Sequence, residues 1–236
     1  MSLTPDRSNS GEIKPFELLQ SSFSQTTSIY LPLLILSSPS LVLQILQVAI
    51  PILETPLNLI EVLFLPPFLS GAGIYFVYRY VSTQTSDLGG AFGKALEKLP
   101  DLFLGFILYL VAVVLGLCLL LVPGIYVAVR LSFVLYGVVV DDLDAMSALK
   151  SSWNLVEGRW LSVFGAQLLV ALCCFLASAT VGFVVGFILG LVLGSKAILI
   201  MTTLGGWVGL IVGLAVSPFV ANYYMKLYLR LKELTK

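Results

Sequence analysis

The chain has 236 residues, of which 58% are hydrophobic and 11% are charged, and its mean hydropathy is +1.02. A soluble domain carries about a quarter charged residues, so this composition excludes a water-soluble globular protein. Thirteen lysines and arginines balance thirteen aspartates and glutamates. We expect no nucleic-acid partner.

Long apolar blocks predict an all-α, polytopic membrane protein. A helix needs about 20 apolar residues to cross the hydrocarbon core of a bilayer. Six blocks meet this requirement, although the fourth is the shortest and depends on its flanking residues. In chain order they cover roughly 29–50, 57–78, 102–122, 125–140, 160–190 and 198–225.

The basic residues predict the orientation of these six spans. If the N-terminus is cytoplasmic and the spans alternate, nearly every lysine and arginine falls on the cytoplasmic side. Only Lys196 lies outside, and Arg130 lies within a span. Positive charge is retained on the cytoplasmic side of membranes. We therefore expect a multi-pass protein of a bacterial cytoplasmic or internal membrane with both termini in the cytoplasm.

Three short segments predict an internal repeat. They are LLQSSF (18–23), AFGKAL (91–96) and ALKSSW (148–153), and each precedes an odd-numbered span in the same register. The second and third carry apolar residues at the spacing of an amphipathic helix. The predicted unit is an interfacial helix, a span outward, a turn and a span back. The alternative is that any interfacial helix in front of a span gives this pattern.

The repeat sets the predicted domain boundaries. Residues 1–11 are expected to form a disordered tail and residues 12–236 a single membrane domain. Asp87 and Asp144 precede the second and third interfacial helices, where a carboxylate accepts hydrogen bonds from the first helical turn. The predicted repeats cover 12–81, 87–140 and 144–230.

The sequence lacks the residue patterns that usually carry enzyme chemistry. The chain has no histidine, and its three cysteines (Cys118, Cys173 and Cys174) lie inside apolar blocks without metal-ligand spacing. We interpret them as buried small hydrophobic residues. No phosphate-binding or dinucleotide-binding motif is present. We expect no enzyme activity, catalytic residue, cofactor or metal, and we assign the acidic run 141–144 to capping and topology.

Glycines recur every four residues in the last two spans. Small residues at this spacing let two helix backbones approach closely in lipid. We predict a tight final hairpin, with the alternative that the glycine strips face another subunit or a lipid groove. The fifth span is also too long for the bilayer as a straight, upright helix. We expect it to tilt, to break or to project beyond the bilayer, and a bend would fall in its glycine-dense half. The strips comprise Gly182, Gly186, Gly190 and Gly194, then Gly205, Gly209 and Gly213.

Two ionisable residues lie at depth in the predicted membrane. Glu61 and Arg130 both fall about two helical turns inside their apolar blocks. A lone charge at this depth is costly, so we predict that the two form an intramembrane ion pair. The alternative is a site for a solute or a lipid headgroup.

Basic and aromatic side chains near the cytoplasmic interface predict lipid contacts. Cationic side chains there attract the anionic lipids of the cytoplasmic leaflet, and tryptophan favours the headgroup level. The predicted contacts are Lys94, Lys98, Trp153, Arg159 and Trp160.

The segment 122–165 carries further marks. They are Pro123-Gly124, Arg130, Ala148, Ser152-Trp153, Gly158, Trp160 and Phe164. With these marks the chain resembles the bacterial membrane-domain family that precedes some glycerophosphodiester phosphodiesterases and also occurs as a free-standing protein. The resemblance implies a six-helix membrane module. The phosphodiesterase activity of such proteins belongs to a separate barrel domain, which we expect to be absent here, and no catalytic residue is carried over.

These observations predict a non-enzymatic accessory or scaffold protein that organises or regulates membrane components at the cytoplasmic face. Its expected partners are membrane lipids, with a second membrane protein left open, as are the substrate and the oligomeric state. The alternative is a small-solute or lipid transporter. Its cavity would lie between the repeats near Glu61 and Arg130, lined also by Gln44, Gln47 and Gln167.

Overall fold

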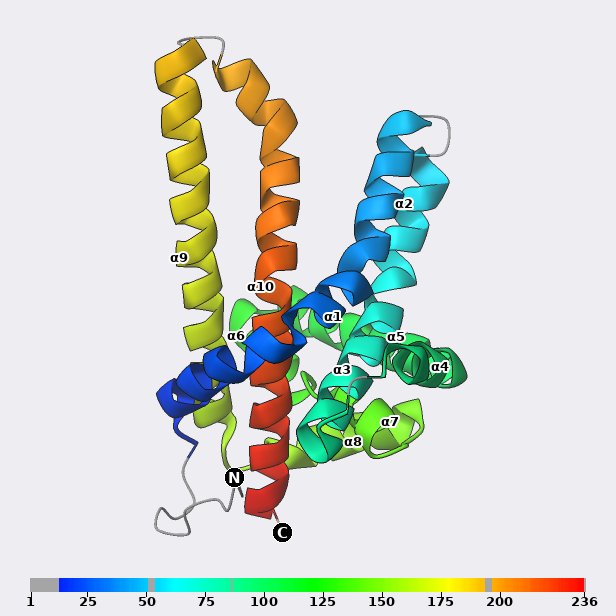
Figure 1. The fold of residues 1–236 in the computed structure, drawn as a ribbon. Helices are drawn as coiled ribbons and strands as arrows, with labels where there is room; N and C mark the ends of the chain where they lie inside the picture. Colours follow the sequence, from blue (N-terminus) through cyan, green and yellow to red (C-terminus); the bar gives the residue numbers. More distant parts are fainter. Residues whose placement is uncertain (1–12, 51–53, 86, 194–196, 236) are drawn as a thin grey trace.

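The computed structural model describes residues 13–50, 54–85, 87–193 and 197–235. Within these ranges the chain forms ten α-helices and no strand, which confirms the all-α class (Figure 1). The predicted tail, residues 1–11, and Lys196 lie outside the described residues. The helices are α1 (Pro15–Ala49), α2 (Glu54–Leu63), α3 (Leu65–Thr83), α4 (Leu88–Glu97), α5 (Leu99–Leu119), α6 (Leu121–Arg130), α7 (Val134–Val140), α8 (Ala145–Leu155), α9 (Trp160–Leu193) and α10 (Ala197–Thr235).

In the described part of the chain, three helical stretches are long and apolar enough to cross a membrane. They are Leu99–Leu119, Leu121–Val140 and Trp160–Val192, and they coincide with the predicted third, fourth and fifth spans. A shorter apolar helix, Ile29–Ser40, falls in the first predicted span. The structure therefore supports a membrane-compatible helical protein, and the count of six spans stays a prediction.

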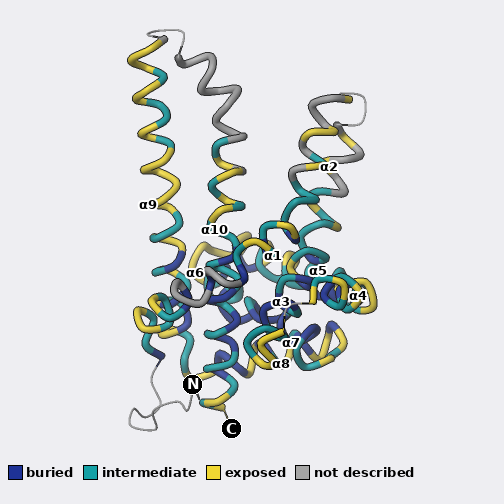
Figure 2. Tube along the Cα trace, viewed as in Figure 1, coloured by how far each residue is buried: buried dark blue, intermediate teal, exposed yellow. Residues whose placement is uncertain are grey.

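The helices divide into a packed layer and two diverging arms. Figure 1 shows α9 and the upper part of α10 rising as one arm, while the second half of α1, α2 and the start of α3 rise as another. Below them, the end of α3, the helices α4, α7 and α8, and the end of α10 form the packed layer. Buried residues gather in this layer, whereas most of α9 is exposed (Figure 2). Phe76, Phe133, Tyr223 and Tyr228 are among the largest fully buried side chains.

Helices form at the positions predicted for the second and third interfacial helices, namely α4 and α8. Asp87 caps α4 by accepting a hydrogen bond from the Gly90 amide at 2.9 Å, and Asp144 caps α8 by accepting one from the Ser147 amide at 3.2 Å. Both N-cap predictions are confirmed. In the first copy the segment 18–23 lies inside α1, which contains Pro32 and Pro39 and changes direction between its two halves (Figure 1). The three-copy organisation itself stays a prediction.

The fifth span is one continuous helix. Helix α9 runs unbroken from Trp160 to Leu193 and is nearly straight in Figure 1, so no bend is formed in its glycine-dense half. At about 1.5 Å per residue it is about 51 Å long, well beyond the hydrocarbon thickness of about 30 Å. A membrane span of this length would have to tilt or extend past the hydrocarbon.

The glycine strips do not make the predicted close contact. A Cβ atom built on Gly182, Gly190, Gly209 or Gly213 meets no neighbouring atom within 4 Å, so at these four positions the prediction of tight packing is wrong. Gly194 lies outside the described residues, and for Gly186 and Gly205 the prediction stands untested. The physical reason is that α9 and the upper part of α10 present these glycines to open space rather than to each other.

Close glycine packing occurs instead between α5 and α6. A Cβ on Gly116 would lie 2.9 Å from the Gly124 Cα, and one on Gly124 would lie 2.8 Å from the backbone nitrogen of Leu117. Neither distance is tolerated by a side-chain carbon, so these two glycines permit the helices to touch.

Candidate functional site

Arg130 is buried at the end of α6 and has no carboxylate partner among the described side chains. Its exposed fraction is 8%. Its Nε and Nη2 donate to the Tyr126 hydroxyl at 3.0 and 2.7 Å, and its Nη1 donates to the Trp153 carbonyl at 2.7 Å. The guanidinium also lies 5.2 Å from the centre of the Tyr126 ring and 4.8 Å from that of Trp153. Oxygen atoms and aromatic faces thus stabilise the charge.

The predicted ion pair between Arg130 and Glu61 is therefore corrected. Glu61 lies on α2, in the arm at the upper right of Figure 1, whereas α6 lies on the other side of the molecule. None of the salt bridges among the described residues joins the two side chains. The predicted depth implies that each residue needs partners, but it does not determine which helices are neighbours.

An aromatic stack extends from the arginine to α9. Tyr126 packs edge-on against Trp153, at 6.0 Å between ring centres, and stacks on Trp160 at 5.5 Å. Trp160 in turn stacks on Phe164 at 5.2 Å, and its indole N–H donates to the Tyr126 carbonyl at 3.2 Å. We call Tyr126, Arg130, Trp153, Trp160 and Phe164 the arginine cluster. It joins α6, α8 and α9, and four of its five members are marks of the family resemblance.

The fourth predicted span is broken directly after the arginine. Residues 131–133 separate α6 from α7. The Ser152 hydroxyl on α8 bridges the break, because it donates to the Arg130 carbonyl at 2.8 Å and accepts from the Phe133 amide at 3.2 Å. Within the break, the Ser132 hydroxyl accepts a hydrogen bond from Gln167 at 2.7 Å. Irregular backbone at membrane depth is tolerated only where protein covers it or where it lines a cavity.

A cavity lies at this break, between the two arms. Its volume is about 600 Å³, and α1, α3, α7, α9 and α10 contribute to its wall. We call it the central cavity. Apolar side chains form most of the lining, and hydroxyl groups are interspersed among them. The hydroxyl-bearing residues are Ser37, Ser70, Ser132, Tyr136, Ser178, Ser217 and Tyr224.

The central cavity differs from the one that the sequence predicted. Neither Glu61 nor Arg130 is among its lining residues. Gln167 reaches it only through its hydrogen bond to Ser132, and the side chains of Gln44 and Gln47 lie outside those described. The hydroxyl lining was missed because isolated serines in apolar blocks carry no distinctive sequence pattern.

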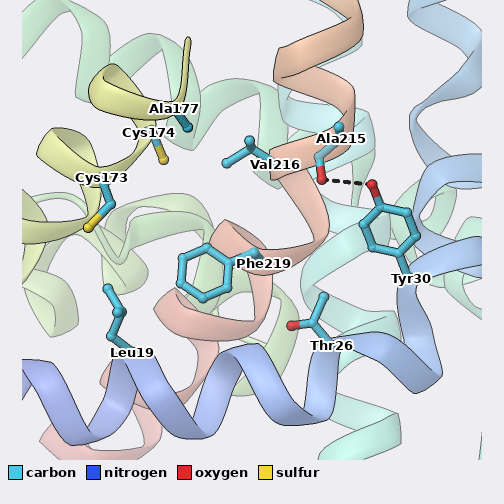
Figure 3. A pocket seen from close by; sticks show the side chains of 9 residues that line it. All are labelled: Leu19, Thr26, Tyr30, Cys173, Cys174, Ala177, Ala215, Val216 and Phe219. Atoms are coloured by element: carbon cyan, nitrogen blue, oxygen red, sulfur yellow. Dashed lines mark hydrogen bonds between the residues drawn. The ribbon is translucent and has the colours of Figure 1, made fainter. Parts of the chain in front are cut away.

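A second, more apolar space lies beside the first, between α1, α9 and α10. Its volume is about 640 Å³, and we call it the lateral groove (Figure 3). Cys173, Cys174 and Ala177 line its α9 side, and Phe219 projects from α10 (Figure 3). At its far edge the Tyr30 hydroxyl donates to the Ala215 carbonyl at 3.0 Å. Cys174 and Val216 line both spaces, so these are adjacent compartments.

The cysteines are less buried than predicted. Cys118 is exposed, and Cys173 and Cys174 are partly exposed at the lateral groove. The interpretation as buried residues is therefore wrong for Cys118, because α5 turns that face away from the other helices. Among the described residues, no group of three metal-ligating side chains gathers in one place.

The predicted lipid-contacting cations have partners within the chain. Lys94 and Lys98 bind Asp142 at 2.8 and 3.1 Å, which joins α4 to the segment before α8. The hydrogen bonds from these two lysines, that of Lys94 first, hold the pKa of Asp142 below its usual value. Arg159 donates to the Leu234 carbonyl at 2.7 Å near the end of α10. Trp153 remains 38% exposed, whereas Trp160 is half-buried in the stack.

The adjacent aspartate ties the layer to the last helix. Asp141 accepts a hydrogen bond from the Tyr228 hydroxyl at 2.7 Å and forms an ion pair with Lys232. The acidic run therefore links three helices, in keeping with its assignment to structure rather than chemistry.

Comparison with known proteins places this arrangement in a family. No curated protein and no solved structure matches the chain. A family model matches residues 87–231, a range that contains helices α4 to α9 and most of α10, with the arginine cluster and the broken span. Since the match covers more than half of the sequence, the chain belongs to the family described as a domain of unknown function (DUF7847).

Proposed function

We propose that this protein is a non-enzymatic, integral membrane accessory protein that holds an amphipathic lipid in its central cavity and organises membrane components at the cytoplasmic face. The observation that carries the proposal is the cavity of about 600 Å³ at the point where the two arms diverge. Its volume lies within the usual range for ligand pockets, about 300–1,000 Å³. Apolar walls with scattered hydroxyl groups suit a molecule with hydrocarbon chains and an ester or hydroxyl group.

The proposal includes the membrane arrangement predicted from the sequence. In it the chain crosses the membrane six times as three repeated units, with both termini in the cytoplasm of a bacterial cell. The packed layer then lies at the cytoplasmic interface, where the exposed Trp153 meets lipid headgroups. The resemblance to the membrane domains that precede some glycerophosphodiester phosphodiesterases supports such a module.

A transporter is the second candidate function. Broken membrane helices mark the substrate sites of many transporters, because their free backbone groups can bind ligands near the bilayer midplane. The break at 131–133 contributes Ser132 to the central cavity. This observation favours transport of a small solute or lipid through the cavity.

The experiment compares two glycine substitutions on the same helix. Gly213 lines the central cavity and Gly209 does not, while a Cβ at either position meets nothing within 4 Å. We expect Gly213→Leu to fill the cavity and to lower the amount of lipid that copurifies in mild detergent, measured by mass spectrometry per mole of protein. Gly209→Leu should retain the wild-type amount.

Two outcomes would overturn the proposal. Equal lipid content in both variants and the wild type would show that the cavity is not the lipid site. If the purified protein moved lipid or solute across liposomes, and Gly213→Leu blocked the movement, the accessory role would be replaced by transport.

A further inference from the structure

Lys226 is a half-buried cation near the cytoplasmic end of α10. Its ammonium donates to the Ser21 hydroxyl on α1 at 3.0 Å. No salt bridge among the described side chains includes it, although Arg230 and Lys232 on the next turns pair with Glu233 and Asp141. Lys226 directly follows the predicted sixth span, and it therefore lies at the depth where phospholipid phosphates are found.

The lateral groove begins two helical turns away on the same side of α10. Phe219 lines the groove and precedes Lys226 by two turns, so the two side chains share a helix face about 10 Å apart along the axis. From Phe219 the groove continues between α9 and α1 with an almost entirely apolar lining (Figure 3). One helix face thus presents a cation at one end and an apolar groove at the other.

Hydrogen bonds keep this arrangement in place. Asn222, which is fully buried between the two features, donates from Nδ2 to the Ser22 carbonyl and to the Thr26 hydroxyl of α1, both at 3.2 Å. These bonds fasten the first half of α1 across α10. The wall formed by Leu19 and Thr26 and the ammonium of Lys226 therefore hold fixed positions.

We propose that the lateral groove binds one acyl chain of an anionic phospholipid whose phosphate pairs with Lys226. The charge of Lys226 selects the anionic headgroup, since an ammonium without a carboxylate partner is complementary to a phosphate. The apolar walls, from Leu19 to Ala177, take the hydrocarbon chain. This inference rests on the proposed function only in placing the chain in a bilayer, because the groove and the central cavity are separate compartments.

The test uses phosphatidylglycerol with a photoreactive diazirine near the end of one acyl chain, in nanodiscs that contain the full-length protein. Cross-linked peptides are identified by mass spectrometry. We expect labelling of α9 around Cys173–Ala177, about fivefold stronger than with the phosphatidylcholine analogue of the same chain, since one lysine near an anionic surface contributes a preference of this size. Lys226→Gln should abolish the preference, and Lys226→Arg should retain it.

A matched control removes one positive charge elsewhere. Lys150 is exposed on α8, so Lys150→Gln should leave the preference unchanged. Equal labelling by the two lipids in the wild type, or a preference that survives Lys226→Gln, would overturn the inference. Absence of labelling on α9 would do the same. Gly213→Leu separates the two proposals, because loss of lipid from the central cavity leaves the groove labelling intact.

Discussion

Tyr126 is the residue on which the buried charge of Arg130 depends most. Its hydroxyl oxygen accepts two of the three hydrogen bonds that the guanidinium makes. Removing that oxygen leaves two buried N–H groups without a partner, which costs about 1–3 kcal/mol. We expect Tyr126→Phe to lower the stability of the protein by this amount, measured by denaturant unfolding in mild detergent with tryptophan fluorescence.

A second tyrosine provides the control for this substitution. Tyr30 donates a single hydrogen bond, to the Ala215 carbonyl at a partly exposed site. Tyr30→Phe should cost no more than about 1 kcal/mol. If the two variants lost the same stability, the arginine cluster would not hold a desolvated charge.

Asp142 combines a charge with an unusual backbone conformation. It pairs with Lys94 and Lys98, and its φ angle is +55°. The lysines lower its pKa in the folded state, so the stability that this carboxylate contributes is present above about pH 4, its unfolded pKa. That contribution is lost as the pH falls through the lower folded value. The side chain is 63% exposed, and the contribution is therefore below about 1 kcal/mol.

Two substitutions separate the charge from the backbone. Asn adopts a left-handed conformation nearly as readily as Asp does. For Ala the same conformation costs about 1 kcal/mol or more. We expect Asp142→Asn to lose only the acid-dependent contribution and Asp142→Ala to be less stable by about 1 kcal/mol further at neutral pH. Unfolding midpoints at pH 3 and pH 7 measure both effects. Identical midpoints for the Asn and Ala variants would contradict the backbone argument.

Sequence patterns predict a contact well when its two partners lie within one helical turn of each other. The caps of Asp87 and Asp144 follow from the pattern of a carboxylate just before an amphipathic helix, and both form. The depth of Arg130 predicts that it needs partners, but the sequence favoured a carboxylate, Glu61, over a hydroxyl and a carbonyl oxygen. Tyr126 lies four residues earlier on the same helix face, and this spacing was a usable signal. The Trp153 carbonyl carries no signal in the sequence.

At the scale of the helix, glycines matter where backbones touch. Gly124 contacts the Leu117 amide, whereas Gly190 faces open space. We expect Gly124→Ala to force α5 and α6 apart and to lower the stability by more than about 1 kcal/mol, as overpacking does. Gly190→Ala should cause no loss, because nothing occupies the site and alanine favours helix. Denaturant unfolding in detergent measures the stability of both variants. A loss of stability in Gly190→Ala would contradict this expectation and support the predicted tight hairpin.

Spacing explains why the glycine strips were misjudged. Residues four apart share a helix face, and this much the sequence establishes for α9 and α10. It does not say whether the face meets another helix, and the pair Gly116 and Gly124 shows that contact follows from the fold instead. The same holds for the break at 131–133. It depends on Ser152 from another helix, and no proline lies at the break.

For the whole molecule, hydropathy was the most informative property. In hydrocarbon, a helix satisfies its own backbone groups, so apolar length alone predicted the helical class. Three of the six predicted spans coincide with long apolar helices among the described residues. The division into a packed layer and two arms was beyond prediction. It arises from long-range pairs such as Tyr228 with Asp141 and Lys226 with Ser21, which join residues far apart in the chain.

The two ends of α5 test the membrane arrangement directly. Helix α5 has 21 residues, which span about 31 Å, so its ends should lie on opposite sides of the bilayer. Glu97 precedes the helix and Leu120 follows it, and both are exposed. In a variant whose three cysteines are replaced by alanine, Glu97→Cys should react with an impermeant maleimide only from the cytoplasmic side, and Leu120→Cys only from the opposite side. Labelling of both from one side would mean that α5 lies along the membrane, and the six-span arrangement with cytoplasmic termini would then be wrong.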